Sequence, residues 1–199
     1  MVRKILSVVI PRFPDGTPNS EKGNILKSVT NSEVSFKDGI MYEKNKLVPF
    51  TGVVLYPFKT GQTEVSIVYK KGIADGMYVE YHINGNIKIN GFYKNGKKSE
   101  LWKEYYRNGL LEKETEYKNN LKEGSEKLYS NSGVLLASYN YKNNDFDGFQ
   151  EQFYSNGKIE WHCSYKNGKK DGIEKKYDKN GHLISKLLYE KGIFKKKLN

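Results

Sequence analysis

The eight residues "YKNGKKDG", from Tyr165 to Gly172, decide the fold because the chain repeats them at a fixed spacing. Near copies are "YKNGKKSE" at 93–100, "YKNNLKEG" at 117–124 and "YKNNDFDG" at 141–148, so that each copy begins 24 residues after the one before. Self-similarity at a fixed period is typical of repeat architectures, in which one structural unit stacks on the next. The period predicts six units between residues 50 and 194.

Glycine and asparagine mark two turns in every unit. One column contains only glycine, at positions 61, 85, 109, 133, 157 and 181, and a second contains only glycine or asparagine, at 72, 96, 120, 144, 168 and 192. Asn-Gly pairs such as Asn84-Gly85 and Asn95-Gly96 favour type I′ hairpin turns, because both residues tolerate positive φ. The runs between the turns have a normal strand length, so each unit is predicted to be one β-hairpin.

Apolar and polar residues alternate within these runs. The second strand of each unit places apolar residues on one parity and ends in a tyrosine, and the other parity is mostly polar. This period of two predicts half-buried antiparallel strands. In the first strand the same reasoning puts Met77 and Val79 on one face, and Tyr78 and Trp102 on the outer face. The tyrosine column consists of Tyr69, Tyr93, Tyr117, Tyr141, Tyr165 and Tyr189.

The ends of the chain break the period. Residues 1–49 are the expected N-terminal cap, with a degenerate hairpin turning at Asp38-Gly39, and residues 195–199 are a basic tail. Repeat arrays need caps because the first and last units each have one surface that no neighbouring unit covers. The apolar run from Ile5 to Ile10 is too short for a signal peptide core or a membrane span. We therefore expect a cytoplasmic protein, although a chain that had lost an export signal would look the same.

Charge and cysteine content limit the function classes. The formal charge of +11 arises mostly from lysine and would attract nucleic acid, acidic protein or anionic phospholipid, although scattered lysines more often serve solubility. The single cysteine, Cys163, excludes an intramolecular disulfide framework.

Three units carry a resemblance to a known family: "DGMYVEYHINGNIKINGFYKNGKK" at 75–98, "DGFQEQFYSNGKIEWHCSYKNGKK" at 147–170 and "DGIEKKYDKNGHLISKLLYEKGIF" at 171–194. They resemble the MORN repeat in its bacterial MORN_2-like variant, with "PFTGVVLY" at 49–56 similar to the usual opening unit. The resemblance implies an all-β fold, an elongated, curved, single-layer antiparallel sheet of tandem hairpins. It also implies a binding scaffold, and the YwqK-like group that it suggests is described as antitoxins.

Catalytic motifs are not convincing. "GFYKNGKK" at 91–98 matches part of a P-loop pattern, but Lys98 occupies the position where Ser or Thr would hold magnesium. His162 and Cys163 are adjacent, so on a strand they face opposite sides. We expect no enzyme, no catalytic or metal site and no cofactor.

Two sets of binding residues remain. A protein partner, or a second copy of the chain, is expected at the aromatic side chains, whereas anionic membrane lipid is the alternative, at lysines expected to line one long edge; nucleic acid ranks below both. The candidate partner-binding residues are Tyr78, Trp102, Tyr106 and Tyr154, and the candidate anion-binding residues are Lys97, Lys98, Lys169, Lys170, Lys195, Lys196 and Lys197.

Overall fold

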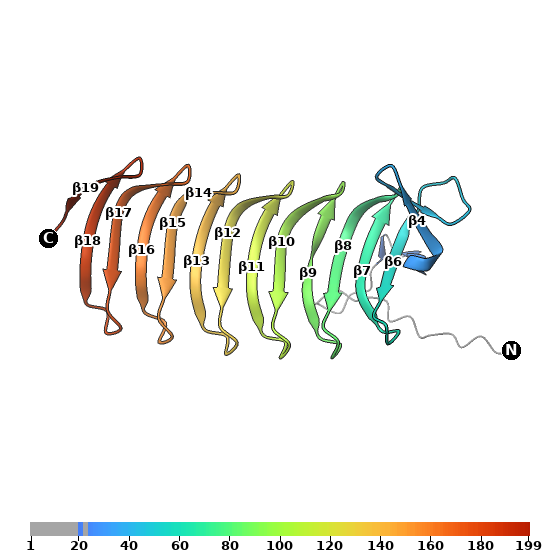
Figure 1. The fold of residues 1–199 in the computed structure, drawn as a ribbon, viewed down its shortest axis with the longest axis horizontal. Helices are drawn as coiled ribbons and strands as arrows, with labels where there is room; N and C mark the ends of the chain where they lie inside the picture. Colours follow the sequence, from blue (N-terminus) through green and yellow to red (C-terminus); the bar gives the residue numbers. More distant parts are fainter. Residues whose placement is uncertain (1–19, 22–23) are drawn as a thin grey trace.

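The computed structural model describes residues 20–21 and 24–199, and the run from Ile5 to Ile10 lies outside the described residues. Its main feature is one open sheet of 15 strands that stand side by side along the long axis of the molecule (Figure 1). The sheet runs in chain order from β6 to β19 (Ile193–Lys197), with β3 (Ser28–Thr30) added beside β6 (Gly52–Pro57). The all-β hairpin array predicted from the period is therefore confirmed.

The remaining strands of the large sheet are β7 (Thr63–Lys70), β8 (Ile73–Tyr81), β9 (Ile87–Lys94), β10 (Lys97–Tyr105), β11 (Leu111–Lys118), β12 (Leu121–Tyr129), β13 (Leu135–Lys142), β14 (Asp145–Phe146), β15 (Gly148–Phe153), β16 (Ile159–Lys166), β17 (Lys169–Tyr177) and β18 (Leu183–Glu190). Two small antiparallel pairs lie outside it: β1 (Ser20–Glu21) with β2 (Asn24–Ile25), and β4 (Val34–Lys37) with β5 (Ile40–Glu43). A 3₁₀-helix, η1 (Asn31–Glu33), precedes β4.

One pairing departs from the wholly antiparallel expectation. β3 runs parallel to β6, with Val29 opposite Val54. Parallel neighbours need a connection of a dozen residues or more, and η1, β4 and β5 provide it, because they return the chain to the sheet in the same direction. The sheet is therefore mixed at this end and antiparallel elsewhere.

The two edges of the sheet use different turns. At one edge both turn residues have positive φ, as in Asn95 (49°) and Gly96 (75°), and this is the predicted type I′ geometry. At the other edge only the glycine does, as in Gly85 (88°). There the amide of Gly85 donates to the carbonyl of His82 at 2.9 Å, and that of His82 donates to Asn86 at 2.8 Å. The type I′ prediction for Asn84-Gly85 is wrong, because a three-residue loop requires left-handed backbone only at its last residue.

Side chains and backbone tie each type I′ turn to the unit before it. The Asn120 amide donates to the Lys98 carbonyl at 3.0 Å, and the Asn120 side-chain oxygen accepts the Lys98 amide at 2.6 Å. Asp147 accepts the Asn167 amide at 3.2 Å, and Asp171 accepts the Lys191 amide at 3.3 Å. Asp147 and Asp171, which directly precede Gly148 and Gly172, therefore join the turn of one unit to the strand of the unit before it.

The register defines two faces, and it corrects the predicted outer face. Tyr78 lies opposite Gly91, so it shares a face with the tyrosine column, which we call the tyrosine face. Trp102 lies on the tyrosine face too, 4% exposed, with its ring against the Cα of Gly91. Alternation shows which residues of one strand share a face, but it does not show which residues of the next strand lie on that same face. The turn length between the strands decides that, together with the bulge between Ser99 and Lys103.

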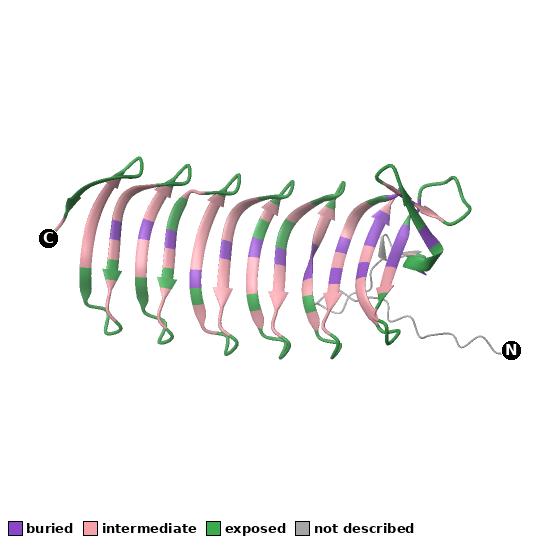
Figure 2. Ribbon diagram, viewed as in Figure 1, coloured by how far each residue is buried: buried purple, intermediate pink, exposed green. Residues whose placement is uncertain are grey.

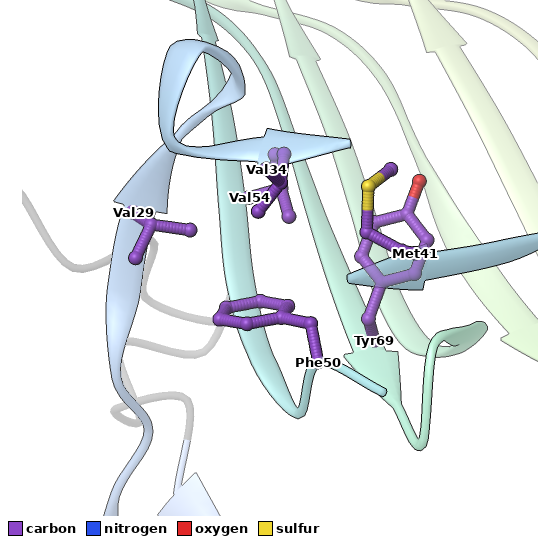
Figure 3. Packing of buried hydrophobic residues seen from close by; sticks show 6 residues of the cluster. All are labelled: Val29, Val34, Met41, Phe50, Val54 and Tyr69. Carbon is purple, nitrogen blue, oxygen red and sulfur yellow. The ribbon is translucent and has the colours of Figure 1, made fainter. Parts of the chain in front are cut away.

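The N-terminal hairpin covers the start of the tyrosine face. Val34 from β4 and Met41 from β5 point toward Val54 and Tyr69 of the sheet, with Phe50 beside them (Figure 3). Along the rest of the array the sheet forms a single layer in which buried residues fall near the middle of the strands and the turns are exposed (Figure 2). Among the residues that the structure describes, the tyrosine face is thus covered at one end and open along most of its length.

Candidate partner-binding face

An aromatic cluster begins where the N-terminal cover ends. Trp102 lies at its centre, with ring centroids 5.3 Å from Tyr78, 5.1 Å from Tyr93 and 6.3 Å from Tyr117. Gly91 makes this possible, because a Cβ at that position would enter the indole ring. The surrounding tyrosines are half-buried, so their rings support Trp102 on one side and remain accessible on the other.

A second cluster lies further along the same face. Phe146 is in contact with Tyr139, Tyr141 and Tyr165, at centroid distances of 5.5, 4.9 and 5.4 Å. All four rings are half-buried. Aromatic rings that are partly exposed on a sheet present apolar area together with hydroxyl groups, a combination typical of protein interfaces.

Polar side chains fill the middle of the face between and beyond the clusters. Glu126, 5% exposed, accepts from the Thr115 hydroxyl at 3.0 Å and the Tyr141 hydroxyl at 3.1 Å. Gln150, fully buried, exchanges hydrogen bonds with the backbone of Asn140 at 3.2 and 2.9 Å. Buried polar groups need such hydrogen-bond partners, so Glu126 and Gln150 stabilise the sheet and are not candidate ligand-binding residues.

Three lysines point onto the tyrosine face from the strand that follows each turn. Lys122 pairs with Glu126 at 2.6 Å and lies 4.5 Å from the centre of the Tyr141 ring. Lys170 pairs with Glu174 and lies 4.7 Å from the Tyr189 ring. Lys98 lies 4.1 Å from the Trp102 ring and has its pKa lowered, chiefly because burial disfavours the charged ammonium. Lys98 and Lys170 were expected on the turn edge, but their side chains fold over the rings.

A cavity of about 400 Å³ opens near the far end of this face. Trp161 and Tyr154 provide aromatic walls, and Lys170, Glu174 and Lys176 provide charges. Sequence reasoning named Tyr154 and Lys170 but missed the role of Trp161, although a tryptophan within a largely polar strand was a usable signal. Gln152, Glu160, Tyr177 and Ile184 complete the lining.

Tyr106 and Tyr154 occupy equivalent places in two units, and each has a structural contact. The Tyr106 hydroxyl donates to the Tyr129 carbonyl at 2.8 Å, and the Tyr154 hydroxyl donates to the Tyr177 carbonyl at 2.8 Å. Each bond joins one unit to the next. Both side chains are half-buried, so their rings still contribute to the surface.

Exposed lysines form a row along the type I′ edge. Lys97 and Lys169 lie there as expected, next to the turns. Sequence reasoning missed the lysine that ends each preceding strand, although it recurs directly after the tyrosine in every "YKN". Lys195–Lys197 are exposed on the terminal strand β19, where Lys195 pairs with Glu190 at 3.2 Å. The missed residues are Lys94, Lys118, Lys142 and Lys166, all exposed.

The residues weighed for catalysis are far from a reactive arrangement. Cys163 is fully buried, and burial raises the pKa of its thiol to about 11. His162 lies on the opposite face, 3.1 Å from Glu151. No group of three or more His, Cys, Asp or Glu in the described part of the chain has metal-binding geometry. Within the same residues, no helix has the length and apolar character needed to cross a membrane.

Four segments, residues 101–119, 122–143, 147–167 and 170–191, match the family model of the MORN repeat variant. Residues 101–191 are an array of MORN repeats. Each matched segment covers one strand pair of the sheet, and β6 to β9, outside the matched segments, continue the same antiparallel pairing. MORN repeats are generally modules that bind proteins or membranes and form non-enzymatic scaffolds. A comparison with curated proteins found no match.

Proposed function

We propose that this chain is a scaffold that binds a protein partner on the tyrosine face. The observation that carries the proposal is the two clusters of half-buried aromatic rings on a sheet whose later strands have no cover among the residues that the structure describes. Rings held by their neighbours lose little conformational entropy on binding, so they make efficient interface anchors. The cavity beside Trp161 would accept one side chain of the partner.

Residue substitutions on the two faces test this proposal. Affinity capture followed by mass spectrometry would identify the partner, and titration calorimetry with the purified partner would give its affinity. We expect Tyr141→Ala and Tyr165→Ala each to weaken binding by about tenfold or more, as for anchor residues of interfaces. Phe149→Ala is the matched control, because Phe149 is 57% exposed on the opposite face. Equal affinities for all three variants would contradict the proposal.

The narrower form of the proposal makes the partner a toxin that this chain neutralises. Its support is the resemblance to antitoxin-like repeat proteins. The product of a neighbouring gene is the first candidate to express alone and together with this chain. The toxin hypothesis is supported if the wild-type chain relieves growth arrest by that product and the Tyr141→Ala variant does not. It is excluded if the wild-type chain leaves the arrest unchanged.

Binding to anionic membranes is the second candidate function, favoured by the exposed lysine row. Lys94, Lys118, Lys142 and Lys166 recur once per hairpin on the same edge, so a flat surface could meet several at once. Each would contribute about 1 kcal/mol near an anionic bilayer. Co-sedimentation with vesicles of phosphatidylserine and phosphatidylcholine should then decrease at high salt and in Lys118→Ala/Lys142→Ala. Binding that survives both changes, or no binding at all, would exclude this alternative.

A further inference from the structure

The three lysines that follow type I′ turns on the tyrosine face, Lys98, Lys122 and Lys170, differ in the residue that lies four positions further along the same strand. Lys122 is followed by Glu126 and Lys170 by Glu174, and each forms an ion pair with its carboxylate. Where the lysine is replaced, by Ala74 or Phe146, the residue four positions later is uncharged, Tyr78 or Gln150. In this column of the repeat, a carboxylate therefore lies four residues after the lysine in two of the three units that have one.

The exception is Lys98, which is followed by Trp102 instead of an acid. Its ammonium lies 4.1 Å from the centre of the Trp102 ring and 5.2 Å from that of Tyr117. No ion pair joins Lys98 to a carboxylate in the part of the chain that the structure describes. Glu104 acts on the Lys98 ammonium only through its charge, and the Glu104 side chain is already paired with Lys113 at 2.6 Å. Among the described residues, Lys98 is thus a partly buried cation without a counterion of its own.

We propose that Lys98, together with Trp102 and Tyr117, is a subsite that takes an aspartate or glutamate side chain of the protein partner. The inference rests on the proposed binding of a protein to the tyrosine face. The incoming carboxylate would take the role that Glu126 and Glu174 have toward Lys122 and Lys170. Because the ammonium is already partly stripped of water, a charge-assisted hydrogen bond to it loses less solvation than one to a fully solvated lysine.

The position of the subsite favours a protein carboxylate over a lipid headgroup. Lys98 points onto the strand face between aromatic rings, whereas the lysines that a flat bilayer would reach lie along the turn edge. Partner residues beside the acid would rest on the Tyr93 and Tyr117 rings. The net charge of +11 further favours an acidic segment over a basic one.

A short capped oligoglutamate peptide is the probe, with oligoglutamine of the same length as its uncharged counterpart. In a Trp161→Phe background, with excitation selective for tryptophan over the 16 tyrosines, the fluorescence comes from Trp102 alone, since the chain has two tryptophans. We expect saturable quenching or a shift with oligoglutamate and none with oligoglutamine. Lys98→Met should weaken binding by about tenfold, the size typical of a charge-assisted pair, and Lys98→Arg should retain most of it.

The matched control is Lys122→Met, because Lys122 belongs to the same column but has Glu126 as its partner. Lys122→Met should leave the oligoglutamate affinity within about twofold of the parent, because Lys122 is not part of the proposed subsite. No saturable binding, or equal losses in Lys98→Met and Lys122→Met, would overturn the subsite. The dichroism spectrum of each variant shows whether it has kept the sheet.

Measurements with the captured partner separate this inference from the proposed function. If Tyr141→Ala weakens partner binding and Lys98→Met does not, the subsite is wrong and the tyrosine face remains the interface. If neither affects it, the proposed function fails, and the subsite fails as a partner contact with it. Lys98-dependent binding to phosphatidylserine vesicles without any response to oligoglutamate would also overturn the proposal.

Discussion

The two ends of the sheet reach stability in different ways. Of the thirteen buried hydrophobic residues among those the structure describes, ten lie between Val29 and Val79, and only Trp102, Ala137 and Cys163 follow. The first strands have apolar side chains on both faces and the β4–β5 hairpin over one of them. Within residues 20–21 and 24–199, the later hairpins have no such cover, and most of their buried residues are polar.

The difference shows what an uncovered sheet can bury. Water reaches both faces of a single layer, so only the residues in the middle of each strand are shielded by their neighbours. Side chains that carry their own hydrogen bonds, such as Thr115, Glu126 and Gln150, suit that partial burial. Cross-strand pairing and the bonds between successive units then hold the array together.

The largest effect is expected at the covered end. Phe50→Ala removes a ring that is 4% exposed and packs against Val54 and Tyr69, so it should cost about 3–5 kcal/mol of unfolding free energy. Phe149→Ala, in the open array, removes a ring that is 57% exposed and should cost less than about 1 kcal/mol. Urea unfolding compares the two. Similar costs would show that the hairpin cover contributes nothing special.

The buried thiol of the open array should make stability fall at high pH. Burial raises the pKa of Cys163 from 9.0 to about 11, so the unfolded chain loses this proton at a lower pH than the folded one. The contribution is therefore complete below pH 9 and is lost as the pH rises toward 11, amounting to about 2–3 kcal/mol. Comparing the wild type with Cys163→Ala isolates it from the tyrosines. Parallel stability curves between those pH values would refute it.

Gly91→Ala tests the junction between the covered and open regions. The added methyl group would enter the Trp102 ring, so we expect a loss of about 1–3 kcal/mol, as for overpacking of a tight site. Trp102→Phe in the same chain should recover part of that loss. Urea unfolding of both single variants and the double variant gives the coupling energy. Additive effects would mean that the ring does not depend on this glycine.

The smallest effect concerns the bonds that join successive units. Tyr106→Phe removes the hydroxyl that donates to the Tyr129 carbonyl and should cost about 0.5–1.5 kcal/mol. Tyr154→Phe should behave alike, because its hydroxyl donates to Tyr177 in the same way. Hydrogen exchange at the adjoining amides would report the local loosening. Unchanged stability in both variants would show that these two hydroxyl hydrogen bonds do not stabilise the open array.

The period of 24 and the turn residues were enough to predict the hairpins and the type I′ edge, because positive φ at Asn95 and Gly96 is a local requirement. The candidate binding residues were harder to place. The alternation along one strand predicted that Trp102 was exposed, whereas the register against β9 buries it beside Tyr93. Turn length and bulges determine that register, and a one-residue shift exchanges the faces of a strand.

By itself, the sequence determined that this protein is an array of β-hairpins, since strand length, turn conformation and repetition depend on residues close together in the chain. Only the tertiary structure decided which side chains meet: Lys98 with Trp102 and Tyr117, Cys163 in the middle of the sheet, and the β4–β5 hairpin over the first strands. Those contacts join different strands, so they follow from register and from the direction of each face, neither of which is encoded at a single position.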